Sequence, residues 1–225
     1  WAVSEGPGAP DYSKLTTTFN GSTLTGVKIP VTDGDVATHA IVVAKEGNGA
    51  SLVLVDLSAA GVTRTVLKTL DPTRSHAKLE FSNTPAQRLG AAGEGSNLAE
   101  AILDRVAVLM AFEQIGGADR ALEMANAYAK ERYAFGRPIG GNQAIKHKLA
   151  EMWVKNQVAR SNAYYGAWAL STNASELPEA AALSRVSANE AFWYASKENI
   201  QTHGGMGFTW EYDCHLYYRR SNALA

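Results

Sequence analysis

The stretch Glu131–Met152 reads ERYAFGRPIGGNQAIKHKLAEM and contains the end of one helix, a sharp corner and the start of another helix. Before it, helix-forming residues run without proline from about Asn97 to Tyr133, and Asn97 with Glu100 has the spacing of a capping box. After the Gly-Gly corner, apolar positions repeat at helical spacing from about Asn142 to Leu170. The stretch therefore predicts two antiparallel helices joined by a turn.

Further helices follow this pair. A third is predicted from about Glu179 to His203, ended by Gly204, and a fourth begins near Glu211. Four helices with short connections predict a bundle. At about 1.5 Å per residue the first helix is on the order of 50 Å long, which favours burial in an oligomer. Gly116-Gly117 within it is either a weak point or a place where another helix approaches closely.

The composition changes near Gly93–Gly95, and the residues before this point are typical of strands. Six short runs rich in Val, Thr and alternating apolar positions are Lys14–Phe19, Gly26–Val31, Ala40–Ala44, Ser51–Val55, Thr63–Leu67 and Ala77–Phe81. Lys45–Ala50 supplies Gly and Asn for a hairpin loop. The predicted fold class is α+β by segments, with an antiparallel β-barrel or sandwich at residues 1–93 and a four-helix bundle at residues 94–225.

The charge and cysteine content exclude several classes of function. The 225 residues include 21 Lys and Arg against 22 Asp and Glu, and this balance argues against a nucleic-acid or anionic membrane surface. No apolar run approaches the roughly 20 residues of a membrane-spanning helix. The single Cys214 excludes an intrachain disulfide and favours the cytoplasm as the location. Because the chain begins at Trp1 without an initiator Met, we interpret it as part of a longer protein.

The sequence contains no pattern typical of a metal site or of a catalytic nucleophile. The five His are scattered without ligand spacing, so no metal site is expected, and no GxSxG motif occurs. Two segments instead favour an anionic ligand. Arg132 and Arg137 lie beside the start of a helix, and Gln201–Glu211 (QTHGGMGFTWE) offers bare backbone at its glycines. The alternative is that Arg132 pairs with a neighbouring Glu while the glycines only turn the chain.

Three motifs resemble one known family. They are Arg-x-x-Phe-Gly-x-x-Ile at residues 132–139, Gln-x-Ile-x-x-x-Leu-Ala-x-Met at 143–152 and Gln-x-x-Gly-Gly-x-Gly at 201–207. This combination resembles the C-terminal domain of the acyl-CoA dehydrogenase family. Upstream, Trp1–Asp11 and Lys28–Gly34 are similar to the family's middle β-domain. The resemblance covers essentially the whole chain and implies that the family's N-terminal helical domain lies outside it.

The resemblance implies FAD at a subunit interface. Arg132 and Phe135 would meet the pyrophosphate and adenine of the partner's FAD, and Gln143 would assist. Residues expected on the adenosine side are Gln201, Gly204 and Gly205. In the β-domain, the residues expected to hydrogen-bond the flavin ring are Val3, Ser4 and Thr32. Pro30 stands where the family has a Trp against the flavin, and Pro10 replaces a Ser that contacts the ligand.

The family's catalytic base is a Glu, and the resemblance leaves its identity open in this chain. The helix position that carries it in some members falls on Val106, which does not titrate. The loop position used by others lies beyond Ala225, so the base is expected there or in a partner chain. Asp104 is either a contact to the CoA moiety or a solvated helix residue.

The resemblance implies a subunit of an FAD-dependent acyl-CoA dehydrogenase that removes hydrogen across the α,β bond of an acyl-CoA thioester. The alternatives are a non-catalytic subunit completing another chain's FAD site, a flavin oxidase relative, and a DNA-associated relative that the lack of a basic stretch disfavours. The expected partners are acyl-CoA, an electron-transfer flavoprotein as acceptor, and further subunits in a homo- or hetero-oligomer, with a dimer of dimers favoured. The motif QTHGGMGFTWEYD is most similar to bacterial members, including mixed assemblies acting on sterol side-chain CoA esters.

Some smaller features have a structural interpretation. The aromatic residues at helical spacing are expected in the bundle core or at an interface; they are Trp153, Tyr164, Tyr165, Trp168 and Trp193. His203 either faces the adenosine or caps its own helix, and Cys214 is expected to be an inert buried thiol.

Overall fold

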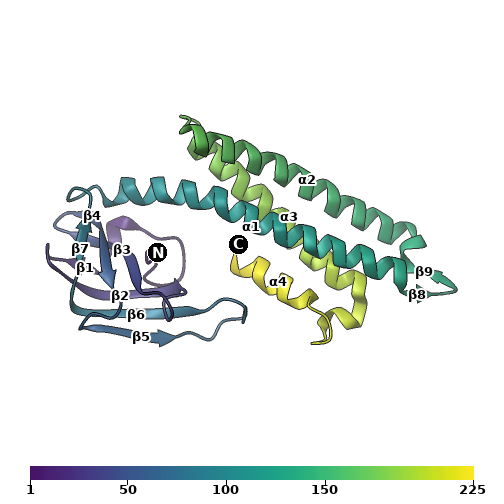
Figure 1. Cartoon of the computed structure of the whole chain (residues 1–225), viewed down its shortest axis with the longest axis horizontal. Helices are drawn as coiled ribbons and strands as arrows, with labels where there is room; N and C mark the ends of the chain where they lie inside the picture. Colours follow the sequence, from purple (N-terminus) through teal and green to yellow (C-terminus); the bar gives the residue numbers. More distant parts are fainter. The chain divides into compact units, whose positions relative to one another are not determined.

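The computed structural model describes residues 1–225, which form two compact units, Trp1–Ile102 and Leu103–Ala225 (Figure 1). The helix α1 (Gly95–Glu131) begins two residues after the predicted boundary at residue 93. Its first turns belong to the first unit, because Leu98, Ala99 and Ile102 pack in one apolar cluster with Leu15 and Val43. The division between the units therefore falls inside this helix.

The first unit is built on one seven-stranded sheet. Its strands are β1 (Thr18–Phe19), β2 (Thr23–Thr32), β3 (His39–Glu46), β4 (Gly49–Asp56), β5 (Val62–Val66), β6 (His76–Pro85) and β7 (Gln87–Leu89). The strand order is β5-β6-β2-β1-β3-β4-β7, and every neighbouring pair except the parallel β1–β3 is antiparallel. Because β5 and β7 are end strands, the sheet is not a closed barrel.

The sheet folds around its own core. One apolar cluster joins Leu24 and Leu79, from β2 and β6, with Val42 and Val53, from β3 and β4, so the two halves of the sheet share a single core. The predicted hairpin is present: β3 and β4 pair without a shift from His39–Asp56 to Glu46–Gly49. The short helical turn η1 (Tyr12–Lys14) precedes β1.

The second unit contains the rest of α1 and the other three predicted helices. After α1 come α2 (Gln143–Thr172), α3 (Leu177–His203) and α4 (Cys214–Ala223). The connections include the two-stranded hairpin of β8 (Tyr133–Ala134) and β9 (Arg137–Pro138), and the turns η2 (Ile139–Gly141) and η3 (Gly204–Phe208). The predicted class, a β-rich domain followed by four helices, is confirmed. None of the helices has the length and apolar character needed to cross a membrane.

The predicted capping box at Asn97 and Glu100 is wrong. The amide of Leu98 already donates to the carbonyl of Glu94, at 3.1 Å, and α1 begins at Gly95. Asn97 therefore lies inside the first turn and does not precede it.

Small residues form the core between the helices. Ala118, Ala121 and Ala125 of α1 pack with Met152 of α2 and Phe192 of α3. A Cβ added at Gly117 would lie 2.4 Å from Phe192 Cζ, so the helices approach closely here and Gly117 is no weak point.

The five aromatic residues predicted in the bundle core or at an interface do not lie in the core. Trp153, Tyr164, Tyr165, Trp168 and Trp193 are between 40% and 61% exposed. Alanine and glycine contacts bring the helix axes too close for indole and phenol rings to fit between them. These rings therefore lie on the outer faces of α2 and α3.

Candidate functional site

The corner between α1 and α2 is a tight hairpin. Phe135 and Gly136 form its turn with φ values of 53° and 79°, and the Phe135 ring is fully exposed. The amide of Ile139 donates to the carbonyl of Arg132 at 2.8 Å, which closes the hairpin directly after α1. This closure fixes the backbone of Arg132 at the helix end.

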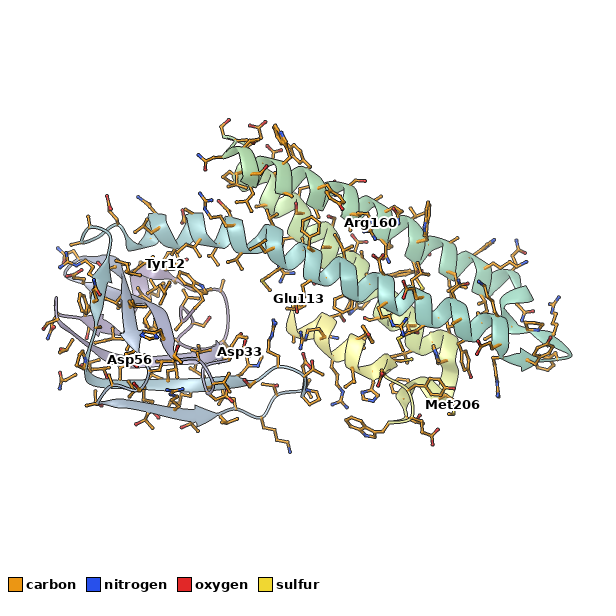
Figure 2. All side chains as sticks on the ribbon, viewed as in Figure 1. Tyr12, Asp33, Asp56, Glu113, Arg160 and Met206 are labelled. Atoms are coloured by element: carbon orange, nitrogen blue, oxygen red, sulfur yellow. The ribbon has the colours of Figure 1, made fainter.

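A hollow of about 420 Å³ joins this corner to the end of α3. It is lined by Arg132 and by Gly204 and Gly205 of the second glycine motif. Met206, which Figure 2 labels on the segment between α3 and α4, is another lining residue. Two motifs about 70 residues apart in sequence thus meet at one cavity, as an anion site requires.

The glycines keep this hollow open. Gly204 has φ 62°, in the left-handed region, and ends α3. A Cβ added at Gly204 or Gly205 would have no neighbour within 4 Å, so neither glycine is required by packing inside the chain. Their bare backbone is available to a ligand at contact distance.

One wall of the hollow is aromatic and uncharged. The ring of His203 stacks on Tyr128, with centroids 4.2 Å apart, and both residues line the cavity. Nδ1 of His203 lies 2.9 Å from the carbonyl of Asn199, one turn earlier, as a helix-end contact predicts. Burial lowers the pKa of His203, against a smaller opposing effect of that carbonyl, which keeps the ring neutral at pH 7.

Arg132 is consequently the one charged side chain lining the hollow. It forms no ion pair, so the alternative that it pairs with a neighbouring Glu is wrong. The neighbouring Arg137 differs, because its Nη2 donates to Asn142 Oδ1 at 2.5 Å. A guanidinium, bare backbone and a flat ring together suit a ligand with a phosphate and an aromatic base.

The remaining predicted residues of this unit lie outside the hollow. Phe135, Gln143 and Gln201 are exposed and do not line it. The side-chain nitrogen of Gln143 is 3.3 Å from His147 Nε2. Cys214 is fully buried, which confirms the predicted burial of its thiol, and burial raises its pKa to about 11.

In the first unit, Val3 and Ser4 line a separate hollow of about 330 Å³. The amide of Ile29 in β2 donates to the carbonyl of Ser4 at 2.8 Å, so the N-terminal segment Trp1–Glu5 lies beside that strand. Thr32 is exposed at the end of β2, opposite His76 of β6. Val3 and Ser4 thus lie beside β2, and Thr32 lies on the same strand, three residues after the Ile29 that bonds Ser4.

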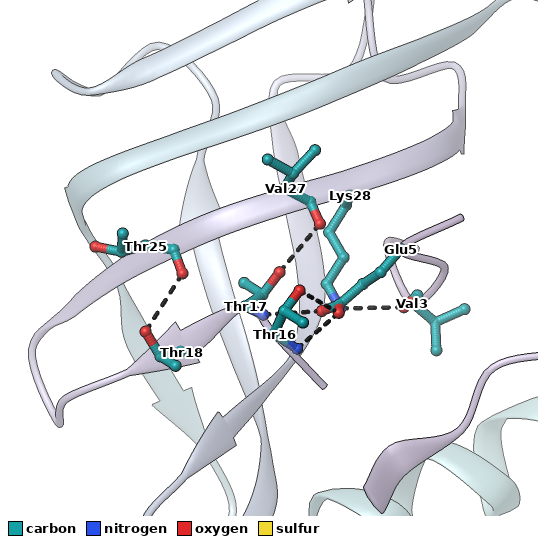
Figure 3. A network of polar contacts seen from close by, with 8 residues as sticks. All are labelled: Val3, Glu5, Thr16, Thr17, Thr18, Thr25, Val27 and Lys28. Atoms are coloured by element: carbon teal, nitrogen blue, oxygen red, sulfur yellow. Dashed lines mark hydrogen bonds and ion pairs between the residues drawn. The ribbon is translucent and has the colours of Figure 1, made fainter. Parts of the chain in front are cut away.

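A buried ion pair fastens this segment (Figure 3). Nζ of Lys28 donates to Glu5 Oε1 at 2.8 Å and to the carbonyl of Val3 at 3.0 Å. The Glu5 carboxylate also accepts from the amide and hydroxyl of Thr16, at 2.7 and 2.6 Å, and from the amide of Thr17 at 3.0 Å. Five donated hydrogen bonds thus join β2, the segment before β1 and the N-terminal segment.

The pKa values follow from these contacts. Burial raises the pKa of Glu5, but the bonds from Lys28, Thr16 and Thr17 outweigh it and bring the pKa from 4.5 to about 2. Burial lowers the pKa of Lys28, and the bond and charge of Glu5 act against that shift. Glu5 is therefore ionised at pH 7, and its charge favours the protonated form of Lys28.

A larger hollow of about 670 Å³ in the first unit was not predicted. Tyr12, Asn48 and Glu100 are among its lining residues. Burial and the charge of Glu100 raise the pKa of Tyr12. Its lining includes Asp11 and Glu100 but no Lys or Arg, so it does not suit a phosphate.

The two residues of α1 considered for chemistry make no specific contact. Asp104 and Val106 are both partly buried, and no hydrogen bond or ion pair involves the Asp104 carboxylate. No group of three or more His, Cys, Asp or Glu side chains is arranged to hold a metal ion.

Two functional neighbours were missed, although the sequence contained a signal for each. Tyr128 is four residues before Arg132 and so shares its helix face. Lys28 alternates with Leu24 on the inward face of β2, and a buried lysine requires an acidic partner. The helix and strand periodicities place these residues on a face, but they do not identify the contacts with His203 and Glu5.

Comparison with known proteins identifies the family. The family model described as "Acyl-CoA dehydrogenase, C-terminal domain" matches residues 93–225, which contain both sides of the Arg132 hollow. The chain belongs to the acyl-CoA dehydrogenase family. The predicted resemblance is therefore confirmed.

Individual acyl-CoA dehydrogenases match over nearly the whole chain. Acyl-CoA dehydrogenase IpdE2 of Mycobacterium tuberculosis is 37% identical over 219 residues, which are 96% of this chain and 62% of that relative. Butyryl-CoA dehydrogenase from Megasphaera elsdenii has a TM-score of 0.93 at 26% identity, over 99% of this chain and 62% of that chain. A variant of the Tcur3481-Tcur3483 steroid ACAD has a TM-score of 0.87 at 28% identity, over 99% and 61%. The chain spans less than two thirds of the length of these acyl-CoA dehydrogenases.

Proposed function

We propose that this chain is a subunit of an FAD-dependent acyl-CoA dehydrogenase that removes hydrogen across the α,β bond of an acyl-CoA thioester. The observation that carries the proposal is the hollow that Arg132, Gly204 and Gly205 line together. Three residues chosen from two separate family motifs share this one cavity. Arg132 would hold the pyrophosphate of FAD, and the two glycines would lie against the adenosine.

The N-terminal segment suits the ring end of an FAD whose phosphates a neighbouring subunit would hold. The carbonyls of Val3 and Ser4 accept from Lys28 and from the amide of Ile29, whereas the amides of Val3 and Ser4 have no partner in the chain. Free amide donors on residues that line a hollow suit the carbonyl oxygens and ring nitrogens of a flavin. Thr32 would add a hydroxyl from the end of β2.

Bound FAD supplies a hydride acceptor, and the protein supplies position and proton transfer. A carboxylate must take the α-proton while the thioester is held against the ring. Val106 has no proton-accepting group, so this carboxylate belongs to residues outside the chain or to a partner subunit. The partly buried Asp104 would contact the CoA moiety.

The outer residues Phe135, Gln143 and Gln201 complete the proposed FAD contacts. All three are exposed and none lines the hollow, so they are free to contact the cofactor of a neighbouring subunit. The proposal therefore includes an oligomer, with a dimer of dimers as its favoured form, and an electron-transfer flavoprotein as acceptor. The free Cys214 thiol supports a reducing location such as the cytoplasm.

A steroid-derived acyl-CoA is the proposed substrate class. The likeness to the Tcur3481-Tcur3483 steroid ACAD variant supports this choice. The likeness to butyryl-CoA dehydrogenase makes a short straight chain the competing class. The likeness to the steroid ACAD variant also supports a mixed assembly, in which this chain has a partner of different sequence.

A non-catalytic partner subunit is the second candidate function. It is favoured by Val106, which cannot act as a base, and by Pro30, which cannot stack on a flavin ring as an indole does. Such a subunit would still contribute Arg132 and Gly204 to the FAD of another chain.

Flavin content and substrate reduction test the proposal. The protein should purify with FAD, and anaerobic addition of a steroid-CoA ester should bleach the flavin absorbance more than butyryl-CoA does. Gly205→Ala should lower FAD retention without lowering the free energy of unfolding, because the added methyl meets only open space. A protein that purifies without FAD and takes up none would contradict the proposal.

A further inference from the structure

Lys28 is the largest side chain that the first unit buries completely, with 0% of its surface exposed. A lysine at such a position is costly unless its charge is paired, and an apolar residue of similar volume would fill the same space. Both acceptors of its Nζ, the Val3 carbonyl and the Glu5 carboxylate, belong to the N-terminal segment. The pair thus joins one short segment to the sheet.

The bond to Val3 has a directional consequence. Since Lys28 occupies the carbonyl of Val3 and Ile29 occupies that of Ser4, the acceptors of both residues are turned toward β2. Their amides have no partner in the chain and remain for a ligand, and both residues line the 330 Å³ hollow. The lysine therefore occupies the Val3 carbonyl and leaves the Val3 amide available.

The acidic partner holds the other end of the same segment. Glu5 accepts three further hydrogen bonds from Thr16 and Thr17, the two residues directly before β1. Val3 and Ser4 are consequently held between the Lys28 contact, the Ile29 amide and the Glu5 carboxylate. Prearranged donors lose less conformational entropy when a ligand binds.

We infer that Glu5 and Lys28 are a positioning pair, which orients the free amides of Val3 and Ser4 toward the flavin ring without touching it. This inference rests on the proposed function, since it specifies how the ring end of FAD is recognised. It requires that loss of the pair weakens FAD binding through the geometry of the segment and not through global stability.

The test compares three variants of the flavin-loaded protein. Lys28→Met keeps the volume but removes both bonds and leaves Glu5 unpaired. The double variant Lys28→Met with Glu5→Gln also removes the unpaired charge, so it should regain much of the lost stability. Arg64→Met is the matched control: Arg64 donates four hydrogen bonds to the carbonyls of Asp35, Ala37 and Leu57 in the same unit and none to the N-terminal segment.

Three measurements are made on each variant: the dissociation constant of FAD, the flavin absorption spectrum, and hydrogen exchange of the Ile29 amide. Both variants lacking Lys28 should bind FAD about tenfold or more weakly, which is the effect of one well-placed hydrogen bond. They should also shift the flavin spectrum and accelerate exchange at Ile29, whose amide reports the contact with Ser4. Arg64→Met should lower the unfolding midpoint but leave all three measurements at their original values.

The outcomes separate the inference from the proposed function. If the double variant regains both stability and FAD affinity, or if Arg64→Met weakens FAD equally, the pair is only structural and the inference is wrong. If the unaltered protein binds no FAD, the proposed function itself is wrong, and the inference falls with it. Weakened FAD binding in the double variant at restored stability would support the positioning role.

Discussion

At the scale of single residues, Arg132 determines the charge of the hollow between α1 and α3. The other lining residues are uncharged, His203 included, because burial lowers its pKa. A phosphate in this hollow would therefore depend on one guanidinium.

Arg132→Ala should weaken FAD binding and leave the fold intact. The loss of one charge-assisted contact corresponds to about 1.5–3 kcal/mol, or about ten- to a hundredfold in the dissociation constant. Arg137→Ala is the matched control, since it removes the same charge from a side chain that bonds Asn142 outside the hollow. Flavin content after dialysis measures both variants, and equal retention by Arg132→Ala and the unaltered protein would refute the assignment.

The Glu5 carboxylate should make stability depend on acidity. Its pKa falls from 4.5 in the unfolded chain to about 2 in the folded protein, so its contribution is complete above about pH 4.5. As the pH falls from there toward 2, protonation of the carboxylate removes the contribution, which is on the order of 2–3 kcal/mol.

Comparison with Glu5→Gln isolates this effect from other carboxylates. The difference in free energy of unfolding between the unaltered protein and Glu5→Gln should be largest near neutral pH and shrink below pH 4.5. Urea denaturation at a series of pH values measures it. A difference that stays constant down to about pH 3 would show that the pKa of Glu5 is not lowered.

At the scale of secondary-structure elements, two adjacent glycines of α1 have different surroundings. A Cβ at Gly117 would lie 2.4 Å from the ring of Phe192, which is 1% exposed, whereas a Cβ at Gly116 would meet nothing within 4 Å. The close approach of α1 and α3 therefore depends on Gly117 and not on Gly116.

The pair Gly117→Ala and Gly116→Ala tests this packing with identical chemistry. Gly117→Ala should lower the free energy of unfolding by about 1–2 kcal/mol, because steric overlap exceeds the gain in helix propensity. Gly116→Ala should raise it by about 0.5–1 kcal/mol. Chemical denaturation decides the matter, and equal effects of the same sign would contradict the observed packing.

The elements themselves could be predicted from the sequence, whereas their inner contacts could not. Periodicity indicated all four helices and the β3–β4 hairpin, because each depends on local spacing and turn residues. The helix start at Gly95 was missed since a backbone bond from Leu98 to Glu94, and no side-chain signal, defines it. For Trp153 and Trp193 the choice between core and outer face stayed open, because spacing cannot tell whether alanines or indoles face the neighbouring helix.

The candidate site shows the same division. Arg132, Gly204 and Gly205 could be selected from motifs, and they share one hollow in the structure. Phe135, Gln143 and Gln201 came from the same motifs, but their exposed positions leave their roles as predictions. Tyr128 and Lys28 were missed because their importance depends on contacts with His203 and Glu5, which lie far away in the sequence.

At the scale of the whole molecule, the outer faces of α2 and α3 carry exposed aromatic rings. Lys197 lies over the ring of Trp193 at 5.0 Å, while Trp153 and Trp168 are about half exposed. Large exposed apolar surfaces on a bundle are typical of subunit interfaces. The predicted oligomer would bury them.

The proposal assigns the two ends of one FAD to different chains, which links cofactor retention to assembly. The ring contacts of Val3 and Ser4 would belong to one subunit, and the phosphate contact of Arg132 to its neighbour. Each chain alone offers half of the contacts, so dissociation into monomers should release FAD. Retention should therefore fall with dilution in parallel with the loss of oligomer.

Size-exclusion chromatography with absorbance detection measures this coupling, together with the ratio of flavin to protein. A homomer that obeys the proposal holds one FAD per chain and bleaches when acyl-CoA is added. A mixed assembly containing this chain as a non-catalytic subunit holds fewer FAD molecules than subunits, and this chain alone does not bleach. A monomer that stays saturated with FAD at every dilution would refute the shared site, because one chain would then supply all the contacts that the cofactor needs.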